Sequence, residues 1–173
     1  WALLTISITI FGIWDTNRVI PAHAYSVNSA AWHNDARLVE SVSRAFGPGA
    51  RILQLPILKF PEQGPIEGLG DYAQLRGELH SKSLCWSYGS VIGRDANRTV
   101  TWQAKNTIQV IEAGRAQGFD ALWLELRAYP DNGAAISQEM RSQLGDPVVS
   151  DGFKQVNVYR LRLNSSPRDE CHP

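Results

Sequence analysis

Isoleucines alternate with threonine and serine through the first part of this chain, and residues 1–14 form its most apolar stretch. A period of two with β-branched residues indicates a buried strand. The stretch is shorter than the about 20 residues needed to cross a bilayer, and it lacks the basic leader of a signal peptide. A cut directly after a transmembrane helix would leave the same kind of start, so the two interpretations are compatible.

Further elements follow from the spacing of apolar positions. Spacings of three and four predict helices over residues 34–46, 71–80, 101–117 and 136–144, with Asn34 or Asp35 as the cap of the first. Apolar runs predict strands over residues 51–57, 84–90, 119–126 and 156–163.

Because strands alternate with helices, we expect an α/β fold. It would be a two-layer or three-layer sandwich whose mainly parallel sheet has the last strand as an antiparallel edge. Residues 1–163 are expected to form a single domain, and residues 164–173 a disordered tail.

The charge balance excludes one broad class of function. The 173 residues include 17 Lys and Arg and 17 Asp and Glu, so the formal net charge is zero. A chain without excess positive charge does not bind nucleic acid through bulk charge. The only methionine is Met140 and the chain starts at Trp1, which indicates a processed product or a piece of a longer protein.

Cysteine and histidine spacing does not favour a metal or cofactor. Cys85 and Cys171 form no CxxC pair, and the four histidines lack the spacing of known metal motifs. Two alternatives stay open for the cysteines: a disulfide in an oxidising compartment, or a buried thiol at Cys85. Gly64, Gly68 and Gly70 lack the Lys-Ser/Thr of a phosphate-binding loop.

Candidate binding residues follow from the expected sheet, since ligands of α/β proteins bind beyond the carboxyl ends of the strands. The positions that this rule selects are Asp15, the loop after Pro56, residues 89–94, Glu125, Arg127 and Tyr129.

Two interpretations compete for the middle of the chain. The run Cys85-Trp86-Ser87-Tyr88-Gly89 is similar to a nucleophile elbow without its first glycine. However, Gly93 and Arg94 come where the helix of an elbow should begin, and we identify no acid and histidine in the usual order. We therefore favour Ser87 as a strand hydroxyl. Arginines, carboxylates and aromatic rings lie around it in the sequence. These groups are typical of sites that recognise sugars or anionic headgroups, and the alternative is that they brace the long loop. These residues are Glu62, Asp71, Trp86, Tyr88, Arg94, Trp102 and Arg127.

One series of motifs resembles a known family, the C-terminal soluble region of bacterial polytopic membrane proteins of the glycosyltransferase-C and phosphoglycerol-transferase-like type. The motifs are LP, FPE, DY, LHS, WSYG and GR, followed by a strand that ends in an acid, an arginine and a tyrosine. The matching residues are Leu55, Pro56, Phe60, Pro61, Glu62, Asp71, Tyr72, Leu79, His80, Ser81, Trp86, Ser87, Tyr88, Gly89, Gly93, Arg94, Glu125, Arg127 and Tyr129.

This resemblance implies an accessory domain on the extracytoplasmic (periplasmic) face of a bacterial inner membrane. Its partner would be the remainder of the parent membrane protein, and it would bind or position a glycan or a lipid-linked sugar without catalysing the transfer. We assign no catalytic residue and expect no cofactor. Two alternatives are a free-standing hydrolase or transferase with a cleft around Asp71, His80, Ser87 and Arg94, and a structural docking module. The ligand-binding candidates are Asp15, Glu62, Asp71, Tyr72, His80, Ser81, Ser87, Tyr88, Arg94, Trp102, Glu125, Arg127 and Tyr129.

Overall fold

A computed structural model describes residues 1–16, 22–61, 63–88, 102 and 105–162 of the chain. The chain divides into two compact units, Trp1–His33 and Asn34–Pro173. The expected tail at residues 164–173 lies outside the described residues.

The first unit contains helix α1 (Ala2–Thr16) and the beginning of helix α2 (Ala22–Phe46). The strand that we expected at residues 1–14 is therefore wrong. In α1 the hydroxyl groups of Thr5, Ser7 and Thr9 donate to the carbonyl oxygens four residues earlier, at 3.2, 2.9 and 2.9 Å. A helix satisfies its backbone and these hydroxyls within one segment, whereas a strand needs a neighbouring strand.

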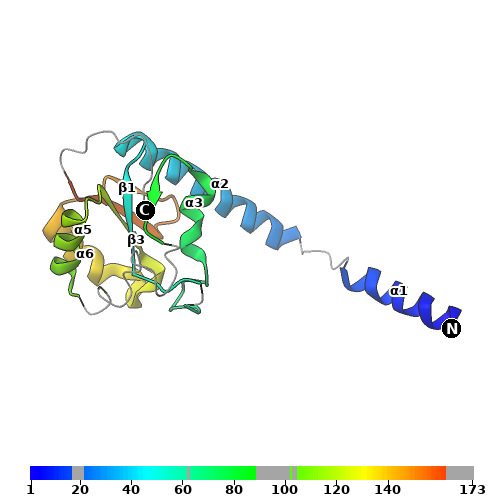
Figure 1. The fold of residues 1–173 in the computed structure, drawn as a ribbon. Coiled ribbons are helices and arrows are strands. Elements are labelled where there is room, and N and C mark those ends of the chain that lie inside the picture. The colour runs from blue at the N-terminus through cyan, green and yellow to red at the C-terminus, as the bar shows by residue number, and fades with distance from the viewer. Residues whose placement is uncertain (17–21, 62, 89–101, 103–104, 163–173) are drawn as a thin grey trace. The chain divides into compact units, whose positions relative to one another are not determined.

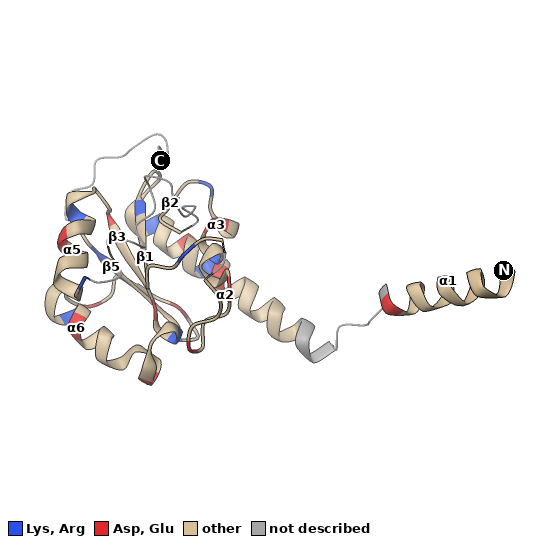
Figure 2. Cartoon of the chain, turned by 60° about the horizontal axis from the view of Figure 1, so that its bottom comes forward, with Lys and Arg blue, Asp and Glu red and all other residues tan. Residues whose placement is uncertain are grey.

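The large apolar side chains of α1 are exposed along the whole helix. Figure 2 shows α1 without a charged residue until the acidic residue at its carboxyl end, Asp15. Among the described residues, no helix combines the length and apolar character needed to cross a membrane.

The second unit is built around a five-stranded sheet in the order β2 (Cys85–Trp86), β1 (Arg51–Leu55), β3 (Ala121–Glu125), β5 (Val156–Arg160) and β4 (Val149–Ser150). Strands β2, β1 and β3 are parallel, while β5 runs antiparallel to both β3 and β4. The α/β fold is confirmed. The last strand is antiparallel as expected, but it lies inside the sheet because the short strand β4 pairs with its outer side and takes the edge.

Helices cover both faces of the sheet (Figure 1). On one face, Leu38, Val42 and Phe46 of α2 pack in a buried cluster with Ile52 and Trp123 of the sheet. The short 3-10 helix η1 (Ala73–Leu75) and helix α3 (Arg76–His80) lie on this same side. Helices α5 (Thr107–Ala116) and α6 (Ala134–Leu144) pack on the other face, so the arrangement has three layers.

The start of α2 differs from the prediction because residues that commonly cap helices lie inside this one. The Asn34 side chain hydrogen-bonds to the Asp151 carboxylate and the Gly152 amide, both at 3.2 Å. Asp35 forms an ion pair with Arg76 at 3.2 Å. Both polar side chains are thus used in tertiary contacts, and the helix begins at Ala22.

The sequence left open whether the two cysteines form a disulfide or remain thiols. Cys85 is disulfide-bonded in the structure. Cys171, the other cysteine of the chain, lies outside the described residues.

Candidate functional site

The strand order creates a point at which chain connections diverge. From β1 the chain passes through α3 to β2 on one side, and it then returns through α5 to β3 on the other side of β1. Because α3 and α5 cover opposite faces of the sheet, the carboxyl ends of β1 and β3 form a topological switch point. Ligands of open α/β sheets bind in the crevice at such a point.

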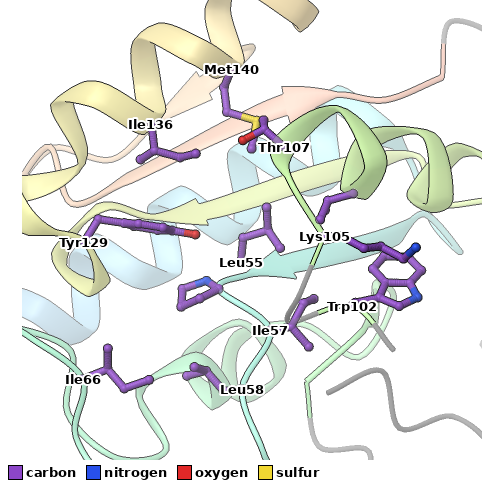
Figure 3. Close-up of a pocket in the computed structure, with 12 residues that line it drawn as sticks. Leu55, Ile57, Leu58, Ile66, Trp102, Lys105, Thr107, Tyr129, Ile136 and Met140 are labelled. Atoms are coloured by element: carbon purple, nitrogen blue, oxygen red, sulfur yellow. The ribbon is translucent and has the colours of Figure 1, made fainter. Parts of the chain in front are cut away.

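A pocket of about 330 Å³ opens at this position (Figure 3). It is bounded by the end of β1 and the loop after it, the segment that leads into α5, the residue after η2 (Leu126–Ala128), and α6. Its lining residues are Leu55, Pro56, Ile57, Leu58, Ile66, Trp102, Lys105, Thr107, Val110, Tyr129, Ile136 and Met140.

Few polar groups interrupt the apolar lining of this pocket. Figure 3 shows the Tyr129 side chain extending across the pocket with its hydroxyl group directed toward Leu55. Burial raises the pKa of the Tyr129 hydroxyl well above its ordinary value, so this group stays protonated and can donate a hydrogen bond. Lys105 is half-buried and its side chain extends beside the Trp102 ring.

The segment before α5 is held in place by its own capping interactions. The Asn106 side chain accepts a hydrogen bond from the Gln109 amide at 3.0 Å, and the Gln109 side chain accepts one from the Asn106 amide at 3.2 Å. This capping box starts α5 at Thr107 and holds Lys105 just ahead of the helix. Our expected helix start at residue 101 was therefore too early, although the Asn-x-x-Gln pattern of the sequence contained the signal.

On the opposite face of the sheet, a buried charge cluster surrounds Glu125, which is the last residue of β3 and is 0% exposed. Its carboxylate forms an ion pair with Arg76 and accepts a hydrogen bond from the Trp123 indole at 2.8 Å. Arg76 also binds Asp35, and its guanidinium lies 5.7 Å from the centre of the Trp123 ring. Burial raises the pKa of Glu125 while Arg76 acts to lower it. The cluster joins α2, α3 and β3. No local motif connects its residues, because Arg76 and Glu125 are 49 positions apart along the chain and Asp35 and Arg76 are 41 apart.

A hydrogen-bonded network next to this cluster includes Ser87. The Ser87 hydroxyl accepts a hydrogen bond from the Gln54 amide at 2.8 Å, and the Gln54 side chain accepts one from the Tyr88 amide at 3.0 Å. The Gln54 side chain also donates to the Gln74 carbonyl oxygen at 2.7 Å. Ser87 thus extends the pairing of β1 with β2, as a strand hydroxyl would.

The aromatic candidates of the long loop pack around Phe60. Its ring meets those of Tyr88 and Tyr72 edge-to-face, at centroid distances of 5.5 and 6.3 Å. Asp71 is exposed, and its carboxylate accepts a hydrogen bond from the Tyr72 amide at 3.1 Å. These contacts brace the loop.

The remaining candidates are distributed over several places. His80 and Ser81 precede β2, whereas Ser87 follows it. Asp15 belongs to the first unit, and Arg127 contributes its carbonyl oxygen to the Gly68 amide at 2.9 Å. Glu62 and Arg94 lie outside the described residues, as do Gly89 and Gly93.

Of the predicted candidates, the structure brings Trp102 and Tyr129 together in the pocket. Sequence reasoning missed Lys105, which lies just ahead of α5, and Thr107, Ile136 and Met140, which belong to α5 and α6. These residues reach the pocket only through the packing of the two helices. Within the described part of the chain, no group of His, Cys, Asp and Glu side chains is arranged to hold a metal ion.

The fold and pocket define an α/β protein with a ligand-sized cavity at its topological switch point. Comparison with protein-family models, curated proteins and solved structures found no match to this chain.

Proposed function

We propose that this chain is a ligand-binding, non-catalytic domain of a membrane-associated protein of the cell envelope. It would lie on the extracytoplasmic face of a bacterial inner membrane and position a lipid-linked sugar for a glycosyltransferase-like parent protein. The motif series from Leu55 to Arg94 supports the family, and the pocket at the carboxyl ends of β1 and β3 is the observation that carries the binding role.

The lining of the pocket favours the apolar part of such a ligand over its sugar. A sugar needs several hydrogen bonds, but among the twelve described lining residues the polar side-chain groups are those of Trp102, Lys105, Thr107 and Tyr129. Apolar surface that enters the pocket gains about 25 cal/mol per Å² removed from water. The volume lies near the lower end of the about 300–1,000 Å³ range of small-molecule pockets.

A binding role also agrees with how the candidate catalytic groups are used. The Ser87 hydroxyl is engaged by the backbone of β1, and the raised pKa of Tyr129 keeps its hydroxyl protonated at neutral pH. Neither hydroxyl hydrogen-bonds to a basic side chain in the part of the chain that the structure describes, whereas an activated nucleophile needs a base within hydrogen-bonding reach.

Two features support the proposed location. Disulfides persist in oxidising compartments outside the cytoplasm, and Cys85 is disulfide-bonded. Helix α1 exposes apolar side chains along its length, with its threonine and serine hydroxyls bonded to its own carbonyl groups. Internal satisfaction of polar groups is what a hydrocarbon environment requires.

Titration with octyl glucoside below its micelle concentration tests the binding role by calorimetry. We expect saturable binding of octyl glucoside and much weaker binding of glucose. Ile136→Trp should weaken the binding at least tenfold because the larger ring fills the pocket. Ile108→Trp, which adds the same ring at an exposed position of α5, is the matched control and should bind as the parent chain does.

Circular dichroism and thermal unfolding of both variants establish that they are folded. Equal affinity for glucose and octyl glucoside, or unchanged binding by a folded Ile136→Trp variant, would contradict the proposal. A chain that binds none of these compounds would instead fit a structural docking module.

The membrane association of α1 gives a separate prediction. Ile8→Lys should lower the fraction of chain that floats with neutral phosphatidylcholine vesicles by about tenfold, because a lysine in the middle of an inserted apolar helix is unfavourable. Ile108→Lys introduces the same charge outside α1 and should leave flotation unchanged. Equal flotation of both variants would contradict a membrane role of α1.

A further inference from the structure

We infer that the pocket selects ligands that combine an apolar body with a single anionic group, and that Lys105 binds this group. This inference rests on the proposed binding function and specifies the class of ligand. It is carried by the charge of Lys105 and by its surroundings, in which the other described lining residues are uncharged.

Among the twelve lining residues that the structure describes, Lys105 is the only charged one. It is half-buried, and it forms no ion pair with the residues that the structure describes. The pocket therefore presents a cation whose counter-ion is not supplied by a lining side chain.

The surroundings of Lys105 make an anion more favourable there than in open solvent. Its side chain lies beside the Trp102 ring (Figure 3), and apolar side chains, Val110 and Ile57 among them, line the same pocket. A charge-assisted hydrogen bond is stronger where apolar walls exclude water. The amino end of α5 adds a partial positive charge of the same sign, because Thr107 begins this ten-residue helix and also lines the pocket.

The size of the pocket limits the apolar body of the ligand. A volume of about 330 Å³ holds on the order of ten carbon atoms, if each occupies roughly the 30 Å³ that a water molecule takes in the liquid. An apolar chain of this length would lie between the Leu55 and Met140 side chains, and Tyr129 could donate a hydrogen bond to a polar atom of the ligand.

The test compares octyl compounds that share one chain and differ in their headgroup. We expect octanoate and octyl phosphate to bind at least tenfold more tightly than octanol, and octyltrimethylammonium to bind most weakly. The ratio of octanoate to octyl phosphate distinguishes a carboxylate ligand from a phosphate ligand. Calorimetry on the full chain, with the concentrations kept below micelle formation, measures all four affinities.

Lys105→Gln should lower the affinity for octanoate and octyl phosphate about tenfold and leave the affinity for octanol unchanged. Lys82→Gln is the matched control, because Lys82 is exposed and precedes β2 on a segment that does not line the pocket. Raising the salt concentration should lower the affinity for octanoate and octyl phosphate but leave the affinity for octanol unchanged.

The possible failures are distinguishable. If octanol, octanoate and octyl glucoside bind equally and Lys105→Gln changes none of them, the inferred anion preference is wrong and the proposed binding function stands. If no octyl compound binds the parent chain, the proposed function itself fails.

Discussion

Replacing Arg76 by alanine should lower the free energy of unfolding by about 3–5 kcal/mol at neutral pH. Glu125 is completely buried, and Arg76 forms an ion pair with its carboxylate. The same guanidinium binds Asp35 and lies over the Trp123 ring. Its removal leaves a buried carboxylate without its cation, and the cost of a buried unpaired charge exceeds the modest gain that the pair itself provides.

The pH dependence of the free energy of unfolding shows whether the unpaired Glu125 carboxylate causes the destabilisation of the Arg76→Ala variant. Burial raises the pKa of Glu125, and Arg76 opposes the rise, so the Arg76→Ala variant should have a still higher pKa at Glu125. The folded chain then keeps a proton that the unfolded chain loses near its ordinary pKa of about 4.3. Stability consequently falls as the pH rises from this value through the folded pKa, and the loss relative to the parent chain should be smaller at low pH.

Urea unfolding at a series of pH values measures both effects. Arg44→Ala is the matched control, since Arg44 pairs with Glu40 on the surface, with 71% and 70% of the two side chains exposed. The Arg44→Ala substitution should lower the free energy of unfolding by about 0.5 kcal/mol or less. If Arg76→Ala destabilised the chain no more than Arg44→Ala, or if its destabilisation did not depend on pH, the buried pair would not have the role assigned to it.

Gly77→Ala should lower the free energy of unfolding by about 1–3 kcal/mol. A Cβ atom at Gly77 would lie 2.6 Å from two ring atoms of Trp86, which is closer than side-chain atoms approach. The Trp86 ring cannot simply turn aside, because it packs edge-to-face on the buried Trp123 ring at a centroid distance of 5.3 Å. The added methyl group must therefore displace α3 or strain the tryptophan pair.

Gly70→Ala provides the comparison for this prediction. A Cβ atom at Gly70 would have no neighbour within 4 Å, and the backbone there is not in the left-handed region. The substitution should be neutral or stabilise the chain by up to about 1 kcal/mol, since alanine restricts the unfolded chain. Thermal unfolding of the two variants measures the difference, and equal midpoints would show that Trp86 does not restrict position 77.

Several elements could be predicted because their signals are local. The apolar runs at residues 51–57 and 119–126 contain β1 and β3, and α6 starts near the predicted position and ends before Gly145. The α1 segment shows the limit of such signals. A run of isoleucine with interspersed threonine and serine satisfies a period of two, yet it forms a helix whose hydroxyls bond back to its own backbone.

The candidate site could be predicted only in part, because the signals in the sequence are local and the site joins distant segments. The rule of strand ends selected Tyr129, which lines the pocket, and Glu125, which lies in the buried charge cluster. Lys105 and Arg76 carry no signal of their own, because a lysine or arginine side chain is ordinarily solvated. Their roles follow from which residues lie opposite them after folding.

The sequence by itself determined the α/β class, the balanced charge and the residues that follow β3, because periodicity and composition act within a few positions of the chain. Only the tertiary structure decided that Lys105 lines an apolar pocket and that Glu125, Arg76 and Asp35 form one buried cluster. The contacts of the cluster join residues 41 or more positions apart, and sheet order and helix packing, rather than local pattern, assemble both the cluster and the pocket.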